Sequence, residues 1–327
     1  MPAMFTLRFD MRAPSDGPAS AADLYSAAIE MAAWAEANGG TAIVLSEHHA
    51  SPDGYLPAPL MLASAIAART THLPITVAAL LVPLHDPIRL AEDLAVLDII
   101  SRGRAVHVIG LGYRDEEYAM FGHSLAERGR RMEESLTALR QALRGDTFEY
   151  RGRPVHVTPP PFTPDGPMMF YGGGSTAAAR RAARFGMGFF AQSSGEHLEM
   201  TYRDECARLG TEPGLCMIPD AESATSVFVA HDVDRAWERI GPHMLHDARM
   251  YASWLGDTVA ASKSTAGSVA DLRAESGAYR ILSPAEAVDY TRRFGMLPLH
   301  PLCGGCPPEL AWETLHLVAS EVVPALS

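Results

Sequence analysis

Hydrophobic and polar positions follow two different periods along this chain. Short β-branched runs, such as residues 75–81 and Ala105–Ile109, have the composition of buried strands, whereas the residues between them place leucines at helical spacing. Asp86 stands where the N-cap of this helix is expected, and Pro87 follows at the first helical position. A strand, a helix and a second strand in this order predict a βαβ unit, in which the two strands are parallel.

The same alternation of strand and helix continues through the whole sequence. Strand-like runs, each followed by a helical run, are predicted at residues 5–10, 41–46, 75–81, 105–109, 168–171, 187–191, 226–230 and 297–300. Eight such units predict an α/β protein, a closed (β/α)8 TIM barrel that forms a single domain over residues 1–327. A doubly wound sheet is the alternative. Residues 256–282, rich in Ala, Ser and Gly, are predicted to be an insertion before the eighth strand and a mobile lid over the barrel mouth.

The composition narrows the classes of function. A net charge of −12 and a pI near 5.5 argue against a surface for nucleic acid or for an anionic membrane. The longest apolar run, residues 73–84, is too short to span a bilayer, and the first residues lack the pattern of a signal peptide. Four cysteines in a chain of this length suit a reducing compartment, so we expect a cytoplasmic protein. The single lysine, Lys263, lies in a stretch of small residues that does not suit Schiff-base chemistry.

Two patterns could hold a metal ion, and each is incomplete. Cys303 and Cys306 form a C-x-x-C pair without a second pair of ligands. His243 and His246 have helical spacing but no evident third ligand. We therefore predict no metal site, and a redox role for the two cysteines is left open.

A glycine-rich turn follows the fifth predicted strand. This GGGST turn, residues 172–176, combines glycines that allow close approach of a ligand with hydroxyls at a helix N-terminus, where free N–H groups attract an anion. Later loops of barrels commonly bind phosphate, so we predict a phosphate site here. An ordinary tight turn is the alternative. A dinucleotide fingerprint is disfavoured, because that motif would follow the first strand.

The second predicted strand ends in Glu47, His48 and His49. Adjacent side chains on a strand point to opposite faces, so at most one of the two histidines can point into the barrel mouth. One imidazole that titrates near neutral pH suits a proton donor or acceptor. The alternative is a core histidine satisfied by Glu47.

Taken in order, these motifs resemble the bacterial luciferase-like family of flavin-dependent monooxygenases and oxidoreductases. The resemblance rests on EHH after the second strand, HDPIRLAEDLAVLDIISRGR, GLGY followed by EE and FG, GGGSTAAARRAA and the closing LHPLCGGCPPELAWETL. It covers essentially the whole chain. The fold of this family is a (β/α)8 barrel, which agrees with the strand count.

The resemblance also implies roles for single residues. His48 matches the catalytic histidine beside the flavin ring, and Ala78 and Ala79 match a non-prolyl cis peptide behind that ring. Glu116 lies near the position that meets the pyrimidine edge of the flavin. The phosphate would bind at the GGGST turn, through Gly173, Gly174, Ser175 and Thr176. One position departs from the pattern: Gly110 stands where luciferase has an arginine on the phosphate, which leaves room for the deazaflavin F420.

Three functions are consistent with these motifs. The first is a two-component monooxygenase, in which reduced FMN from a separate flavin reductase and O₂ oxygenate a small organic substrate. The second is an F420-dependent oxidoreductase that transfers a hydride. The third is a barrel that binds flavin without catalysis. The resemblance further implies a homodimer, and the small side chains of residues 60–69 would let two helices pack closely, although this helix could instead pack only on its own barrel.

Overall fold

The computed structural model describes residues 5–256 and 260–326 of the chain. Within these residues, one ten-stranded sheet has the order β11-β10-β12-β1-β2-β3-β4-β7-β8-β9, and a separate antiparallel hairpin pairs β5 with β6. The strands are β1 (Phe5–Phe9), β2 (Gly40–Leu45), β3 (Ile75–Leu80), β4 (Ala105–Ile109), β5 (Phe148–Tyr150), β6 (Arg153–Val155), β7 (Met168–Gly173), β8 (Gly188–Ala191), β9 (Cys216–Met217), β10 (Ser226–Val229), β11 (Tyr279–Leu282) and β12 (Leu297–Leu299). All paired strands of the large sheet are parallel, as the βαβ pattern predicts.

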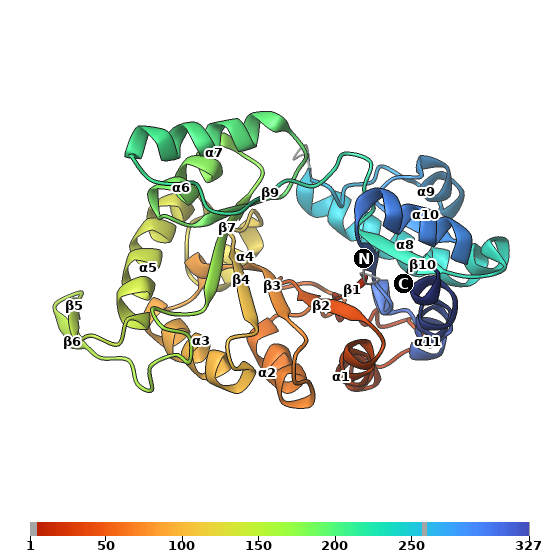
Figure 1. Cartoon of the computed structure of the whole chain (residues 1–327), viewed down its shortest axis with the longest axis horizontal. Coiled ribbons are helices and arrows are strands. Elements are labelled where there is room, and N and C mark those ends of the chain that lie inside the picture. Colours follow the sequence, from red (N-terminus) through yellow and green to blue (C-terminus); the bar gives the residue numbers. More distant parts are fainter. Residues whose placement is uncertain (1–4, 257–259, 327) are drawn as a thin grey trace.

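Helices surround this sheet on its outer side (Figure 1). They are α1 (Ala21–Ala37), α2 (Pro59–Arg69), α3 (Pro87–Ser101), α4 (Asp115–Met120), α5 (Arg128–Leu143), α6 (Thr176–Arg184), α7 (Glu196–Leu209), α8 (Val233–Leu255), α9 (Val269–Glu275), α10 (Pro284–Phe294), α11 (Pro308–Leu317) and α12 (Val323–Leu326). The predicted N-cap of α3 is confirmed, because the Asp86 carboxylate accepts hydrogen bonds from the N–H groups of Ile88 and Arg89. In the described part of the chain, no helix is both long and apolar enough to cross a membrane.

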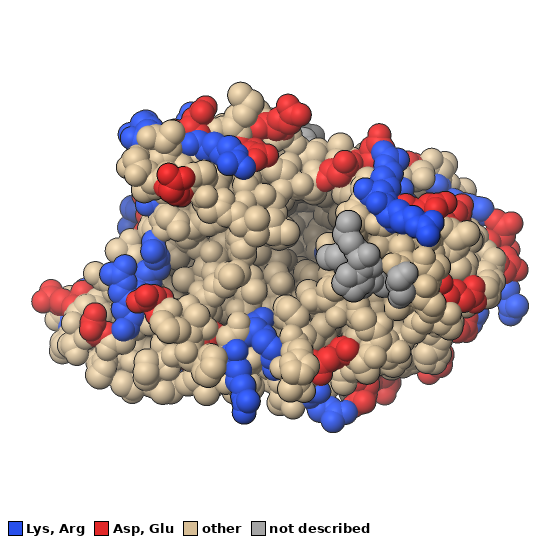
Figure 2. Space-filling view, in the orientation of Figure 1, with Lys and Arg blue, Asp and Glu red and all other residues tan. Residues whose placement is uncertain are grey.

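All eight predicted strands are present in the order of a (β/α)8 barrel, which confirms the predicted fold class, but within the described residues the sheet does not close. Closure would require β8 to pair with β10. Instead, the edge of β8 that faces away from β7 pairs with β9, and the edge of β10 that faces away from β12 pairs with β11. The reason lies in β11, where Tyr279 and Ile281 alternate as buried residues and form a strand along β10. Figure 2 shows a central hollow between α6 and α7 on one side and α8 to α10 on the other, with most charged side chains near the outer margins.

The segment predicted as an insertion is partly regular structure. Residues 256–282 contain α9 and β11, and the Tyr279 hydroxyl donates a hydrogen bond of 2.8 Å to Asp247. The N–H of Ala261 donates to the carbonyl of Gln192 at 3.1 Å, which ties the start of the segment to the end of β8. A lid could therefore include only the part before α9, and that role stays a prediction. Residues 257–259 lie outside the described residues.

Side chains along β1 alternate between the two faces of the sheet. We call the space on the inner face, away from the helices, the lumen. Leu7 and Phe9 are fully buried and belong to one core cluster with Leu24 and Met31 of α1, outside the sheet. Arg8 lies between them and therefore projects to the opposite, inner face of the sheet. The lumen thus receives the polar side chain of Arg8 from β1.

Candidate active site

The structure brings the predicted site residues to one edge of the sheet. His48 follows β2, Ala79 lies near the end of β3, Gly110 follows β4, and the GGGST turn joins β7 to α6. These four strands are consecutive neighbours and parallel, so their carboxyl ends meet at the same edge. In barrels of this kind, that edge carries the chemistry.

His48 is buried and bonded on both sides of its ring. Its Nδ1 lies 2.9 Å from Oε1 of Glu117, and its Nε2 lies 3.4 Å from the hydroxyl of Tyr113. Burial lowers the pKa of His48, against the opposing influence of Glu117, so the imidazole is neutral near pH 7. Burial alone would raise the pKa of Glu117, but its hydrogen bonds lower it overall, and its carboxylate is ionised.

These protonation states determine the tautomer of His48. A carboxylate can only accept, so the proton of the neutral ring must be on Nδ1 and be donated to Glu117. Nε2 then keeps its lone pair and faces Tyr113. The geometry therefore presents an oriented proton acceptor at Nε2.

His49 points to a different carboxylate. Its Nε2 lies 2.8 Å from Oε1 of Glu47, an atom that is also 2.8 Å from Nε2 of His85. Burial alone would raise the pKa of Glu47, but these two histidines and the N–H of Leu81 lower it to about 2. The two adjacent histidines thus bond to different carboxylates, and the one satisfied by Glu47 is His49. Which of them points into the mouth stays a prediction.

Four aromatic side chains surround His48, and we call them the aromatic cage: Tyr55, Tyr113, Tyr251 and Trp254. The rings of Tyr55 and Trp254 come closest, each with its centroid 4.8 Å from that of His48. Tyr251 and Trp254 come from the last turns of α8. Their spacing of three residues places them on one face of the helix. This spacing could have indicated from the sequence that the two aromatic side chains lie together.

Trp254 lies between two guanidinium groups. The central carbon of Arg12 is 4.6 Å from the centroid of its ring, and that of Arg114 is 4.2 Å away. Each contact lies within the range of a cation–π interaction. Arg114 also donates to the carbonyl of His49 at 2.6 Å and to Glu117 at 3.2 Å, so the aromatic cage and the His48–Glu117 pair share one anchor.

A group of four potential metal ligands lies beneath the cage. Ligand atoms of Asp10, Asp247, His300 and Cys303 are within 4.8 Å of one another in the described structure. The Nε atom of Arg12 is 2.8 Å from Asp247 and 3.7 Å from Asp10. The guanidinium therefore supplies positive charge where a cation would bind. The absence of a metal site stays a prediction.

The GGGST turn has the features of an anion site. Gly174, Ser175 and Thr176 are exposed, and the Ser175 hydroxyl accepts from the N–H of Ala178 at 3.2 Å, which caps α6. The N–H groups of Thr176 and Ala177 lie in the first turn, where a helix offers no acceptor of its own. The geometry thus suits an anion, and binding of a cofactor phosphate at this turn stays a prediction.

Gly110 is a glycine for a steric reason. A Cβ atom there would lie 2.6 Å from Cβ of Ala79, so no larger side chain fits without a shift of β3. The bond between Ala78 and Ala79 is cis, which confirms that expectation, and the register of β3 against β4 shifts at this point. The missing arginine at position 110 is therefore a consequence of how β3 and β4 pack.

Glu116 does not face this site. It is exposed on α4, whereas the next residue, Glu117, is buried and contacts His48. The contact of Glu116 with a flavin stays a prediction. The acidic residue that contacts His48 is Glu117, which the sequence motif did not indicate.

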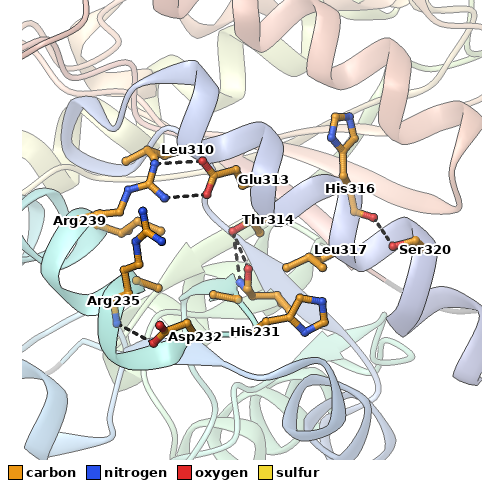
Figure 3. Close-up of a pocket in the computed structure, with 14 residues that line it drawn as sticks. His231, Asp232, Arg235, Arg239, Leu310, Glu313, Thr314, His316, Leu317 and Ser320 are labelled. Atoms are coloured by element: carbon orange, nitrogen blue, oxygen red, sulfur yellow. Dashed lines mark hydrogen bonds and ion pairs between the residues drawn. The ribbon is translucent and has the colours of Figure 1, made fainter.

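A separate cavity of about 560 Å³ lies between α8 and α11. Its lining falls within residues 229–240 and 310–320 (Figure 3). Arg239 and Glu313 form a two-bond ion pair on its wall, at 2.9 and 3.0 Å. This pair neutralises two of the charges that line the cavity.

Comparison with known proteins places the chain in a family. The model of the luciferase-like monooxygenases matches residues 4–298. The chain belongs to this family. Among curated members, the oxygenase component of the flavin-dependent trigonelline monooxygenase of Acinetobacter baylyi is 32% identical over 131 residues, which are 39% of this chain and 36% of that protein. Limonene 1,2-monooxygenase of Rhodococcus erythropolis is 30% identical over 122 residues, or 35% and 32% of the two chains. These matches thus span about a third of each curated relative's length.

Solved structures share the fold over almost the whole chain. Monooxygenase RslO1 from Streptomyces bottropensis has a TM-score of 0.76 at 22% identity, covering 99% of this chain and 100% of that one. The oxygenating constituent of 3,6-diketocamphane monooxygenase from Pseudomonas putida, solved with FMN, has a TM-score of 0.68 at 19% identity, covering 99% of each chain. An F420-dependent secondary alcohol dehydrogenase has a TM-score of 0.69 at 16% identity, also covering 99% of each. At these identities the likeness establishes the fold.

Proposed function

We propose that this protein is the oxygenase component of a two-component flavin-dependent monooxygenase, which oxygenates a small organic substrate. When bound, reduced FMN supplies the electrons that activate O₂. The observation that carries the proposal is the oriented, neutral His48, whose Nε2 keeps its lone pair and which follows β2 at the same sheet edge as the GGGST turn. A separate reductase would supply the reduced flavin, as the relative named an oxygenase component suggests.

Each part of the site then has a task. The N–H groups at the start of α6 and the hydroxyls of Ser175 and Thr176 hold the phosphate. Nε2 of His48 takes or returns a proton, while Glu117 keeps the proton on Nδ1. The aromatic cage excludes water from the imidazole, which is only 6% exposed.

A specific observation favours a second candidate, an F420-dependent oxidoreductase. The close approach of Gly110 to Ala79 leaves no space for the arginine that holds the FMN phosphate in luciferase, so the phosphate of FMN would be held by the GGGST turn alone. One structural neighbour binds an F420 adduct, and that cofactor differs from FMN in its tail and in its indifference to oxygen.

The test is a cofactor panel. The purified chain is titrated anaerobically with reduced FMN, oxidised FMN and reduced F420, and binding is followed by absorbance and calorimetry. Tighter binding of reduced FMN, with oxygen-dependent product formation from trial substrates, supports the monooxygenase. Exclusive binding of F420 supports the second candidate. Binding of neither cofactor contradicts both.

We also propose a homodimer formed through α2 and α3, in a cytoplasmic protein. The two helices contact each other, and their outer surface carries four exposed apolar side chains: Met61, Val96, Ile99 and Ile100. An adjoining apolar surface on two helices is typical of an interface. The inner face of α2, with Leu62 and Ile66, packs on the sheet of its own chain. Its outer face is then available for a second copy of the chain.

A further inference from the structure

We propose that Arg8 forms an anion subsite in the lumen, which binds a carboxylate group of the substrate beside His48. This inference rests on the proposed function only in taking the lumen near His48 as the substrate site. It assigns the substrate to the organic carboxylates and Arg8 to the recognition of the charge.

Arg8 is placed where a ligand can reach it. It lies on the inner face of β1, one residue before the end of the strand, and its side chain is partly exposed. Its Nη2 donates to the hydroxyl of Tyr251 at 2.7 Å, which holds the guanidinium in one orientation. Arginine keeps its charge at every physiological pH, so a positive charge is always present at this position.

This charge has no carboxylate partner within residues 5–256 and 260–326, and the central carbon of Arg8 lies 5.5 Å from the centroid of the Tyr251 ring. The hydroxyl of Tyr251 is the hydrogen-bond acceptor of Arg8 there, and no carboxylate oxygen lies within ion-pair distance. Asp247 is the carboxylate whose charge acts on Arg8 from further away. Its Oδ1 is already bonded to Arg12 and its Oδ2 to Tyr279, at 2.8 Å each. The remaining N–H groups of Arg8 are thus available for a ligand.

The subsite is continuous with the aromatic cage. The Tyr251 hydroxyl that fixes Arg8 lies 2.8 Å from the hydroxyl of Tyr55, and the rings of both tyrosines contact His48. A ligand whose acidic group meets Arg8 would therefore have the rest of its body near the cage and Nε2 of His48. The charge would fix the orientation of the substrate, which positions its reacting carbon.

The surroundings favour a carboxylate over a phosphate. A single guanidinium offers a planar pair of donors that matches one carboxylate. The buried acidic groups Asp10, Asp53 and Asp247 lie on the Arg12 side of the lumen, and their charge opposes a dianion. The chain already has a better phosphate site in the GGGST turn.

The test compares benzoate with benzamide, which has the same shape without the charge. Calorimetric titrations use the wild-type chain with FMN bound, so that the GGGST turn is filled. We expect benzoate to bind about tenfold or more tightly than benzamide. Arg8→Gln, which keeps an N–H donor for Tyr251 but removes the charge, should abolish this difference. Arg153→Met removes an exposed arginine of the β5–β6 hairpin and should leave it unchanged.

Either of two results would overturn the subsite: equal affinity for the two ligands in the wild type, or a benzoate preference that survives in Arg8→Gln. If that variant does not fold, as judged by circular dichroism, the wild-type comparison and Tyr251→Phe decide. Tyr251→Phe frees the guanidinium and should weaken the binding of benzoate more than the binding of benzamide.

The flavin titrations test the proposed function independently of this comparison. Failure to bind any flavin contradicts the proposed function, whereas the benzoate comparison can then be made on the chain alone.

Discussion

His48 and Glu117 meet at 2.9 Å between Nδ1 and Oε1, although 69 residues separate them in the chain. The contact joins the end of β2 to α4, and Arg114, one turn before Glu117, donates to the same carboxylate oxygen at 3.2 Å. The pair therefore fixes the orientation of the imidazole before any ligand binds.

Replacing His48 should separate catalysis from binding. His48→Ala removes the oriented proton acceptor, so turnover should fall by about 10²–10⁴-fold, while flavin affinity changes by only a few-fold. Steady-state kinetics and a flavin titration measure the two effects. His156→Ala, at an exposed position, is the control. Turnover within a few-fold of the wild type would make His48 a structural residue.

Glu117→Gln should move the pH profile in a defined direction. The carboxylate raises the pKa of His48 against the stronger influence of burial. The amide can still accept from Nδ1 but carries no charge, so the pKa of His48 falls further. The acid limb of kcat/KM, measured from about pH 5 to 9, should shift to lower pH. A shift to higher pH would mean that the two residues are not coupled in this way.

His107 should make the fold sensitive to acid. It is fully buried in β4, burial lowers its pKa to about 4, and neither ring nitrogen has a partner among the described residues. The unfolded chain takes up this proton near pH 6.5 and the folded chain only near pH 4. The free energy of unfolding therefore decreases as the pH falls through this window, by up to about 1.4 kcal/mol per unit.

Removing that imidazole should relieve the effect. His107→Leu should raise the free energy of unfolding by about 1 kcal/mol at pH 7, and by more at pH 5, because it replaces unpaired polar atoms by apolar ones. Urea unfolding at both pH values measures the change. His72→Gln, at an exposed position, serves as the control. An equal change at pH 7 and pH 5 would contradict the titration argument.

The GGGST turn can be tested with two ligands that differ only in the phosphate. Gly174→Phe puts a side chain where the anion would lie, on an exposed turn, so FMN affinity should fall at least about tenfold. Riboflavin lacks the phosphate and should bind both proteins alike. A parallel loss for both ligands would indicate a damaged site instead of a lost phosphate contact.

The proposed dimer has a matched pair of variants. Met61 on α2 is 76% exposed and Met200 on α7 is 61% exposed. Met61→Glu should convert a dimer into a monomer, because it places a charge in an apolar interface, whereas Met200→Glu should not. Light scattering at micromolar concentration gives the mass. A monomeric wild type would contradict the proposal directly.

The features of this fold that depend only on residues close together in the sequence could be predicted. The strands and the cap of α3 follow from local spacing, and all of them are present. Barrel closure could not be predicted, because it depends on which distant strand pairs with β10. Tyr279 and Ile281 carry a strand pattern, but nothing local says that they take that edge.

The candidate site likewise has residues that could be predicted from local sequence and residues that could not. His48 lies directly after a predicted strand, so its position at the sheet edge could be predicted. The choice between Glu116 and Glu117 depends on the rotation of α4, which a motif match does not fix. Trp254 comes from a helix that starts more than twenty residues earlier, and only the folded chain shows which face of α8 reaches His48.

The position of Trp254 between Arg12 and Arg114 gives the protein an internal optical reporter. Indole emission responds to nearby charge, and a ligand that enters beside His48 must alter at least one of these contacts. Two of the other three tryptophans, Trp34 and Trp312, pack against each other at the junction of α1 and α11. The difference in fluorescence between the wild type and Trp254→Phe would therefore follow occupancy of the lumen in real time, without a label.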